Sequence, residues 1–190
     1  MIAIMERIVI LGCAGSGKTT LAQKLGQRIG GPVICLDDIW QPLWDEKDVP
    51  AFRNLIDRTH GGTSWISDGN FALATFDIRL GRATQVIWLE CSRLVCCWRA
   101  LKRVFRRGEA HRIADLSKVL KFIWRFDRVN RPRIESARLL HGSDVAVRRL
   151  RGTREVAEFL RCCGEGPRYS MYSAAVSLGP EKAWTTKGAK

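Results

Sequence analysis

The stretch that decides the fold is IVILGCAGSGKTTLA, residues 8–22. The four apolar residues 8–11 predict a short buried strand, and the residues from Thr19 onward open a helical pattern. Between them, residues 12–19 match the spacing G-x-x-x-x-G-K-[ST], which is typical of a phosphate-binding P-loop. The alternative is a glycine-rich turn that only connects a strand to a helix. Because the motif lies in the strand–loop–helix context that it requires, we favour nucleotide binding.

Each residue type in this loop suits the binding of a triphosphate. Glycine lets backbone N–H groups approach the phosphates without a clash from a Cβ atom. The following helix directs its unpaired N–H groups and the positive end of its dipole at the same anion. Lys18 supplies a mobile charge for the outer phosphates, and the Thr19 hydroxyl is placed to ligate Mg²⁺.

Length and composition indicate one intracellular domain. A chain of 190 residues is long enough to bury a core without cross-links. Seven cysteines include the adjacent pairs Cys96-Cys97 and Cys162-Cys163, which suit neither easy bridging nor a metal knuckle, so we expect reduced thiols. No run approaches 18 uninterrupted apolar residues, and the apolar run near the N-terminus leads into the P-loop. We expect a cytoplasmic protein with no membrane partner.

Apolar runs and helical patterns alternate along the chain, which is typical of a parallel α/β sheet. The predicted strands are 7–11, 32–36, 64–67, 85–89 and 144–150. The predicted helices are 18–29, 49–59, 92–107, 116–140 and 154–162. From residue 164 the periodicity disappears, and Gly, Pro, Ser and Lys become frequent. We therefore expect a single domain over 1–163 and a disordered tail over 164–190.

Carboxylates follow the second and third predicted strands, and ligands collect at these strand ends in such sheets. Asp68 can hold Mg²⁺ directly or through water, or it can form a simple turn with Gly69. Asp37 and Asp38 can accept a proton from a substrate hydroxyl, bind an amine or a sugar, or cap the next helix. We assign Asp68 to the metal and Asp37 to the acceptor.

Basic residues gather on two predicted helical faces, and the net charge of +13 implies an acidic partner, either nucleic acid or phosphorylated small molecules. The first face, with spacing i, i+4, i+7 and i+8, holds Arg99, Arg103, Arg106 and Arg107. The opposite face of that helix, expected to pack on the body, holds Leu94, Trp98, Leu101 and Phe105. The second basic face holds Lys118, Lys121, Arg125 and Arg128.

Two basic faces joined by the polar stretch 108–115 predict a lid over about 99–128 that closes over phosphates. The alternative is a pair of solvated amphipathic helices. We favour the lid because phosphoryl transfer needs cations around the moving phosphate.

These motifs together resemble the P-loop kinases of the adenylate-kinase and shikimate-kinase group. More narrowly, the chain is similar to the small bacterial proteins often labelled DNA topology modulation proteins. The resemblance covers about residues 7–160. It rests on RIVILGCAGSGKTTLA, LDDIWQPLW, WISDGNF, QVIWLE, the arginine-rich helix and WRFDRVNRPRI.

The resemblance implies a P-loop NTPase fold, an α/β three-layer sandwich with five parallel strands and a helical lid between the fourth and fifth. It implies that Asp68 fills the acidic position after the third strand and that Arg99, Arg103 and Arg106 fill lid positions. It also implies ATP with Mg²⁺ as cofactors. The residues expected to bind the nucleotide are Gly12, Gly15, Ser16, Gly17, Lys18, Thr19 and Thr20.

The sequence departs from the pattern of these kinases at two points, one that concerns the acceptor and one that concerns a structural metal. Nucleoside-monophosphate kinases of this group carry an arginine shortly after the Asp-Gly pair, where it binds the acceptor phosphate. Here the next arginine is Arg79, so we expect a nucleoside or another small hydroxylated acceptor at least as readily as a monophosphate. The lid stretch also lacks a four-cysteine pattern, so no structural zinc is expected.

The sequence thus predicts a small-molecule kinase. Lys18, Mg²⁺ and the lid arginines would stabilise the transferring phosphoryl group, and Asp37 would orient or deprotonate the acceptor. The alternative is a DNA-binding regulatory ATPase, which the net charge allows. No helix-turn-helix, zinc finger or platform of stacked aromatic residues supports nucleic-acid binding. The oligomeric state stays open.

Overall fold

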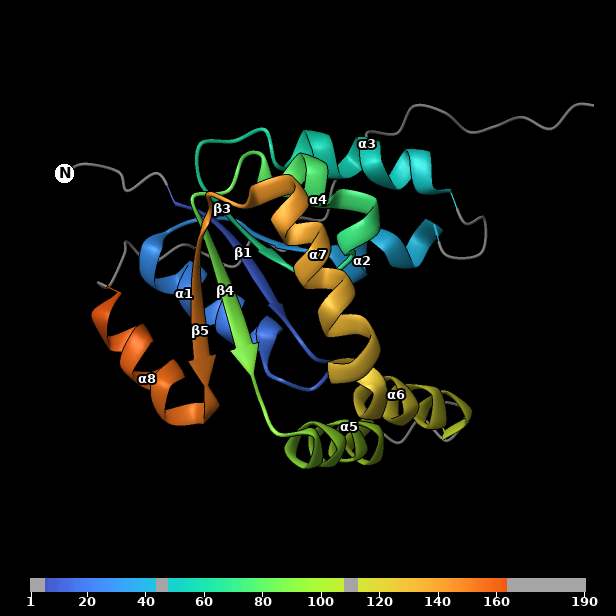
Figure 1. The fold of residues 1–190 in the computed structure, drawn as a ribbon. Coiled ribbons are helices and arrows are strands. Elements are labelled where there is room, and N and C mark those ends of the chain that lie inside the picture. The colour runs from blue at the N-terminus through green and yellow to red at the C-terminus, as the bar shows by residue number, and fades with distance from the viewer. Residues whose placement is uncertain (1–5, 44–47, 108–112, 164–190) are drawn as a thin grey trace, which may run out of the picture.

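A five-stranded parallel sheet forms the centre of the protein, in the order β2-β3-β1-β4-β5 (Figure 1). The computed structural model describes residues 6–43, 48–107 and 113–163. The strands are β1 (Arg7–Gly12), β2 (Val33–Cys35), β3 (Trp65–Asp68), β4 (Gln85–Glu90) and β5 (Ala146–Arg151). The predicted α/β class with five parallel strands is confirmed.

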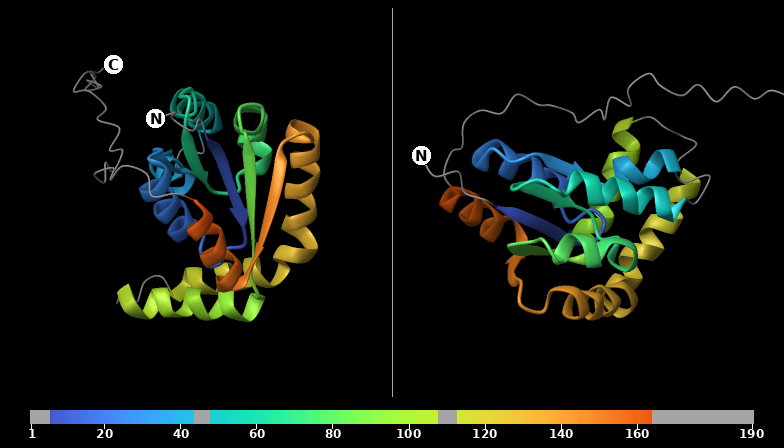
Figure 2. Two further views of the ribbon diagram at one scale, coloured as in Figure 1. Left: turned by 90° about the vertical axis from the view of Figure 1, so that its left-hand side faces the viewer. Right: turned by 90° about the horizontal axis from the view of Figure 1, so that it is seen from above.

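Helices cover both faces of this sheet. The α-helices are α1 (Lys18–Ile29), α2 (Leu36–Trp40), α3 (Val49–Thr59), α4 (Ala72–Leu80), α5 (Arg93–Arg107), α6 (Ile113–Arg125), α7 (Arg131–Gly142) and α8 (Gly152–Cys162). A short 3₁₀ turn, η1 (Gln41–Leu43), follows α2, and a π-helical turn, η3 (Phe126–Asn130), joins α6 to α7. Helices α1 and α8 pack on one face and α4 and α7 on the other, while α5 and α6 lie beyond the carboxyl ends of the strands (Figure 2).

The strands are continuous apolar runs in the sequence because the core extends over both faces of the sheet. A parallel strand with helices on both faces buries its side chains on both faces. In β1, Val9 and Leu11 join the cluster under α4 and α7, whereas Ile8 and Ile10 join the cluster under α1 and α8. Within the described ranges, none of the helices has the length and apolar character needed to span a bilayer.

The sequence predicts neither α2 nor α4. Helix α4 lies between α3 and α7, so it has no single apolar stripe, and its buried residues include Thr75 and Arg79. Its N-cap is Phe71, which has φ 31° and makes no capping bond through its side chain, so the usual start signal is absent.

The single predicted helix over 116–140 is wrong. It divides into α6, the π turn η3 and α7, and Pro132 lies in the first turn of α7. Proline has no N–H group for a continuous helical ladder, and it favours a helix start. The predicted tail, 164–190, and the middle of the predicted lid, 108–112, lie outside the described residues.

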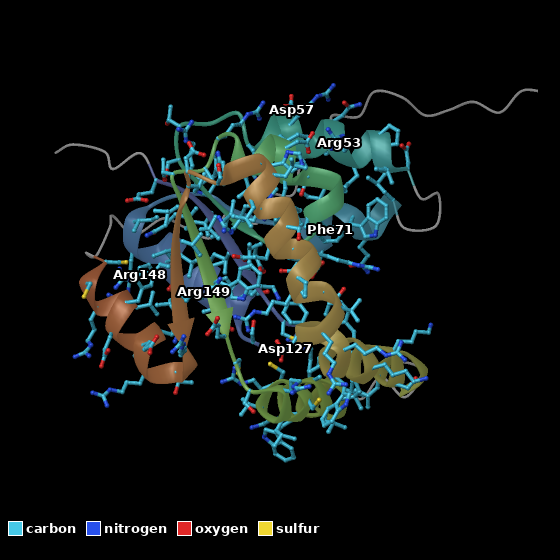
Figure 3. The ribbon with its side chains drawn as sticks, in the orientation of Figure 1. Arg53, Asp57, Phe71, Asp127, Arg148 and Arg149 are labelled. Atoms are coloured by element: carbon cyan, nitrogen blue, oxygen red, sulfur yellow. The ribbon has the colours of Figure 1, made fainter. Side chains whose placement is uncertain are left out.

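Glu90 ties β4 to β5 and α7 at the carboxyl edge of the sheet. Its carboxylate accepts hydrogen bonds from Arg131 at 2.6 Å and from Arg149 and Arg151 at 3.0 Å each (Arg149 is labelled in Figure 3). Arg131 and Arg149 also lie over the ring of buried Trp88, at 5.9 and 5.4 Å from its centroid. Burial raises the pKa of Glu90, but the hydrogen bonds and charges of the arginines outweigh it, so the net pKa is lowered.

We expect Glu90→Gln to lower the free energy of unfolding by about 1–2 kcal/mol at pH 7, because the arginines lose their shared carboxylate. Since the pKa of Glu90 is lowered in the folded state, its contribution is present above the ordinary value of 4.5 and is lost as the pH falls through the folded-state pKa. Urea denaturation at several pH values should show a deficit at pH 7 that shrinks in acid.

The matched control is Glu158→Gln, which removes only a surface pair with Arg154 at 3.0 Å. Exposed pairs of this kind contribute about 0.5 kcal/mol or less. Equal losses in the two variants would contradict a special role for Glu90.

Candidate active site

The P-loop is shaped by glycines that no other residue can replace without strain. Gly12, Gly15 and Gly17 have φ values of 148°, 77° and 101°. A Cβ atom on Gly12 would lie 2.7 Å from the carbonyl oxygen of Leu89, and one on Gly15 would lie 2.6 Å from that of Cys96. The loop is therefore pressed between the end of β4 and helix α5, with its backbone bare of side chains at both contacts.

The loop also has the donors that a phosphate requires. The N-terminus of α1 follows directly at Lys18, with unpaired N–H groups and the positive end of its dipole. The Ser16 hydroxyl is buried and has no hydrogen-bond partner, and the Lys18 ammonium group reaches across the loop to the Cys13 carbonyl at 3.0 Å. These groups fit a bound anion. Thr20, also predicted to bind nucleotide, is exposed on the first turn of α1.

Asp68 and Thr19, the two predicted metal ligands, lie together. The Thr19 hydroxyl donates a hydrogen bond to Oδ2 of Asp68 at 2.5 Å. Asp68 is 3% exposed at the end of β3, and its second oxygen, Oδ1, is buried without a partner. An unpaired buried carboxylate oxygen beside a hydroxyl suits a hard cation such as Mg²⁺.

The described residues hold no cluster of three or more His, Cys, Asp or Glu side chains that could bind a metal by themselves. Mg²⁺ does not require one, because it is commonly held by one or two protein groups together with phosphate oxygens and water. The Thr19–Asp68 pair is therefore compatible with a metal that arrives with a nucleotide, and the metal role of these residues stays a prediction.

A cavity of about 500 Å³ opens beside the P-loop. Its polar lining includes Lys18, Asp37, Asn130 and Arg133. Phe71, labelled in Figure 3 at the start of α4, adds an apolar wall. This volume lies within the range of sites for small molecules.

Asp37 is placed in this cavity by its position directly after β2. It lies in the first turn of α2, and although it keeps contact with solvent, the cavity walls partly desolvate its carboxyl group. This burial raises its pKa, the charges of Asp68 and Asp38 raise it further, and Lys18 and Arg103 act against the increase. A carboxylate with a raised pKa is a better proton acceptor than a free aspartate.

Asn70 and Arg79 support the site, although no sequence pattern marks either of them as a site residue. The Asn70 side chain accepts from the Gly12 N–H at 3.2 Å and donates to the Gly12 carbonyl at 2.9 Å. The Arg79 guanidinium is fully buried, and it donates to the carbonyls of Gly69 at 2.8 Å and Asn70 at 3.1 Å. Burial lowers the pKa of Arg79 to about 9, against the opposing charge of Asp68. Arg79 thus holds the loop after β3 and does not line the cavity.

The predicted lid arginines lie differently from one another. Arg99 donates to the carbonyl oxygens of Ser16 at 3.1 Å and Gly15 at 3.4 Å, so it fixes the P-loop backbone against α5. Arg103 is exposed, and its charge reaches Asp37. The side chain of Arg106 lies outside the part of the chain that the structure describes.

The expected packing face of α5 is wrong at Leu94 and Trp98, whereas Leu101 is half-buried and the side chain of Phe105 lies outside the described residues. Leu94 and Trp98 are 70% and 66% exposed, whereas Cys96 and Ala100 are buried. The physical reason is that α5 packs against the P-loop through backbone at Cys96, where a close approach requires small residues. The sequence pattern contains no signal for this backbone contact, so it predicted that the bulky apolar residues face inward.

The cavity lining includes Phe122, Asn130 and Arg133, which the sequence analysis did not single out. All three come from the segment 122–133, which the helical break at η3 bends toward the P-loop. Only their presence within the motif WRFDRVNRPRI pointed to this region. No ion pair is found for Arg133 within the described ranges.

Comparison with solved structures shows the fold. The chain superimposes on shikimate kinase from Acinetobacter baumannii, solved with shikimate, with a TM-score of 0.53 and 14% identity, over 84% of this chain and 91% of that one. For shikimate kinase from Bacteroides thetaiotaomicron the TM-score is 0.54 with 17% identity, over 83% and 95%. A gluconokinase from Sinorhizobium meliloti 1021 gives 0.50 and 18%, over 83% and 88%.

Neither a family model nor a curated protein matches the sequence. The narrower resemblance to DNA topology modulation proteins is therefore not confirmed. The comparisons show that this chain shares the overall α/β fold of these structures. Its own coordinates place the glycine-rich loop, Asp37 and Asp68 at the carboxyl edge of the sheet.

We expect Arg79→Ala to cost about 3 kcal/mol or more of folding free energy, because it leaves a cavity and two buried carbonyls without donors. The matched control is Arg82→Ala, which removes a half-exposed arginine paired with Asp57 at 2.6 Å and should cost about 1 kcal/mol or less. Urea denaturation of both variants measures the difference. A loss in Arg79→Ala no larger than in the control would refute the supporting role.

Proposed function

We propose that the chain is an ATP-dependent kinase that transfers the γ-phosphoryl group to a hydroxyl of a small molecule. The observation that carries this proposal is the shared cavity, where Asp37 faces the same space as Lys18 of the P-loop. A proton acceptor beside a phosphate-binding cation is the minimum arrangement for moving a phosphoryl group to a hydroxyl. The fold shared with small kinases supports the same proposal.

In this mechanism, the P-loop backbone and Lys18 bind the phosphates of ATP. Thr19 and Asp68 would hold Mg²⁺, which neutralises charge on the phosphate oxygens when bound. Asp37 accepts the proton of the acceptor hydroxyl as the hydroxyl oxygen attacks phosphorus, and ADP is the leaving group. Arg103, whose charge already reaches Asp37, is placed to stabilise charge on the transferring group, and Arg106 is proposed to assist it. Arg99 acts by holding the loop.

The cavity also bears on the acceptor. Phe71 and Phe122 provide apolar lining, and Arg133 and Asn130 provide polar groups in addition to Asp37. These features suit a hydroxylated molecule with an apolar or planar body, such as a nucleoside, a nucleotide or another small metabolite. Arg79 does not line the cavity, so the site has no arginine directly after Asp68 for an acceptor phosphate.

A panel assay tests the proposal. ATP consumption is measured with nucleosides, nucleoside monophosphates and small hydroxylated metabolites, and separately with duplex DNA, using Lys18→Ala as the inactive control. We expect one class of small acceptor to be phosphorylated by the wild type only. ATP consumption that responds to DNA and to no small acceptor would favour the DNA-binding ATPase instead.

We expect Asp37→Asn to reduce phosphoryl transfer by about 10²–10⁴-fold, the usual effect of losing a general base, while ATP affinity changes little. The rate of the wild type should fall as the pH drops through the raised pKa of Asp37. Steady-state kinetics and ATP titration of the same variant separate the two effects.

The same loss of charge at Asp37 that lowers the rate should increase the free energy of unfolding. Because the pKa of Asp37 is raised in the folded state, its ionised form destabilises the fold, and this cost disappears as the pH falls below the ordinary value of 3.8. Asp37→Asn should therefore be at least as stable as the wild type at pH 7. Asp38→Asn, a neighbour that does not line the cavity, is the control; it should lower the pKa of Asp37 and leave the rate well above that pKa unchanged. A normal rate in Asp37→Asn would remove this residue from the mechanism.

A further inference from the structure

The outer face of α5, defined by Leu94, Val95, Trp98 and Lys102, is apolar and exposed. Leu94 and Trp98 are 70% and 66% exposed, Val95 is 39% exposed, and Lys102 continues the same row one turn further. Spacing of four residues aligns Leu94, Trp98 and Lys102 along the helix. Large apolar side chains that group in this way mark an interaction surface more often than scattered ones do.

The neighbouring helix α6 also exposes a large aromatic residue. Trp124 is 58% exposed, and the Arg93 guanidinium at the start of α5 lies 5.4 Å from its ring centroid. Lys121 lies on the same face as Trp124, at i and i+3, and is exposed. Figures 1 and 2 show α5 and α6 side by side as the layer beyond the carboxyl ends of the strands. Each of these two helices thus carries an exposed tryptophan.

Positive charge is concentrated on the same two helices. Helix α5 carries six basic residues and no acidic one, and α6 carries three basic residues and one acidic one. Their combined charge is 9 − 1 = +8, out of +13 for the whole chain. Within the described ranges, the exposed cations Lys102, Lys121 and Arg125 form no ion pair. The apolar outer face therefore lies in a strongly positive field.

We propose that the outer face of α5 docks on an anionic lipid membrane. Leucine and tryptophan at the tip of a basic helix enter the boundary between headgroups and acyl chains, while lysines and arginines contact the acidic headgroups. Tryptophan is favoured at this depth because its ring is amphipathic. The expectation of no membrane partner rested on spanning segments, and a helix lying on the surface needs none.

The same observations disfavour two other occupants. A second copy of this chain would bring two faces of like charge together, which is repulsive. Nucleic acid would satisfy the cations, but it gives Leu94 and Val95 nothing to bury against. The membrane is the occupant that uses both the charge and the apolar residues.

Docking uses a part of α5 that the nucleotide site does not. Arg99 and the backbone at Cys96 contact the P-loop from the other side of the helix. The inference is therefore independent of the proposed kinase activity, and it is tested without ATP.

Co-sedimentation with vesicles is the test, using the full chain and vesicles of phosphatidylcholine with or without phosphatidylglycerol. We expect binding to the anionic vesicles only. Leu94→Ser/Trp98→Ser should weaken it by at least about tenfold, because both side chains lose their apolar contact. Lys102→Glu/Lys121→Glu should weaken it by about 20-fold or more, since each basic residue near the surface changes partitioning by about fivefold.

The matched control is Leu139→Ser/Leu140→Ser. These leucines are 54% and 77% exposed on α7, and Figure 1 shows the C-terminal end of that helix at the opposite end of the molecule from α5. This variant should bind within about twofold of the wild type. Circular dichroism checks that each variant folds, and the single variants Leu94→Ser and Trp98→Ser replace the double one if it does not.

Three results would overturn the inference. The first is binding that does not require anionic lipid, whether it is equal for neutral vesicles or absent for both kinds. The second is vesicle binding that Leu94→Ser/Trp98→Ser leaves intact, and the third is loss of binding in the α7 control. Tight duplex DNA binding without vesicle binding would assign the face to nucleic acid. Dimerisation that Trp98→Ser abolishes, in a protein that ignores vesicles, would assign it to a second copy.

Discussion

The close packing of the P-loop between β4 and α5 is the constraint on which the rest of the site depends. Side chains are excluded at Gly12 by the carbonyl of Leu89 and at Gly15 by the carbonyl of Cys96. Because the loop has no side chains at these points, its backbone N–H groups are left to face a ligand. The same contact fixes α5, which brings Arg99 onto the loop and leaves Leu94 and Trp98 facing outward.

The groups around the loop form successive layers of support. Asp68 bonds Thr19 at the start of α1, and Asn70 bonds Gly12 at the end of β1. Arg79 donates hydrogen bonds to the carbonyls of residues 69 and 70, and this contact requires a guanidinium group to be buried. The two terminal nitrogens of Arg79 are hydrogen-bonded, whereas its buried Nε has no partner within the described residues, so the bonds to residues 69–70 only partly offset the cost of burial. Asp37 is set against this rigid wall, at the edge of the cavity.

The sequence predicted the fold well because its strongest signals are local. The apolar run before the P-loop, Lys18 and the strand-end positions of Asp37 and Asp68 follow from spacing alone, and the structure brings them to one edge of the sheet. Tertiary contacts could not be predicted from the local sequence pattern. Arg79 donates to the Gly69 carbonyl because it lies on the buried helix α4. Arg133 lines the cavity because a new helix begins beside Pro132. The apolar face of α5 was assigned inward because an exposed Trp98 contradicts the usual pattern for a helix on a protein body.

Calorimetry can show directly whether nucleotide binding requires a P-loop backbone without a side chain at Gly15. The binding of ATP with Mg²⁺ is measured for the wild type, Gly15→Ala and Gly61→Ala. Gly15 has φ 77°, and its Cβ would meet the Cys96 carbonyl at 2.6 Å, whereas a Cβ on Gly61 would lie 3.5 Å from the nearest atom. We expect the wild type and Gly61→Ala to bind alike and Gly15→Ala to bind at least about tenfold more weakly. Equal affinity in all three proteins, or no binding by the wild type, would contradict it.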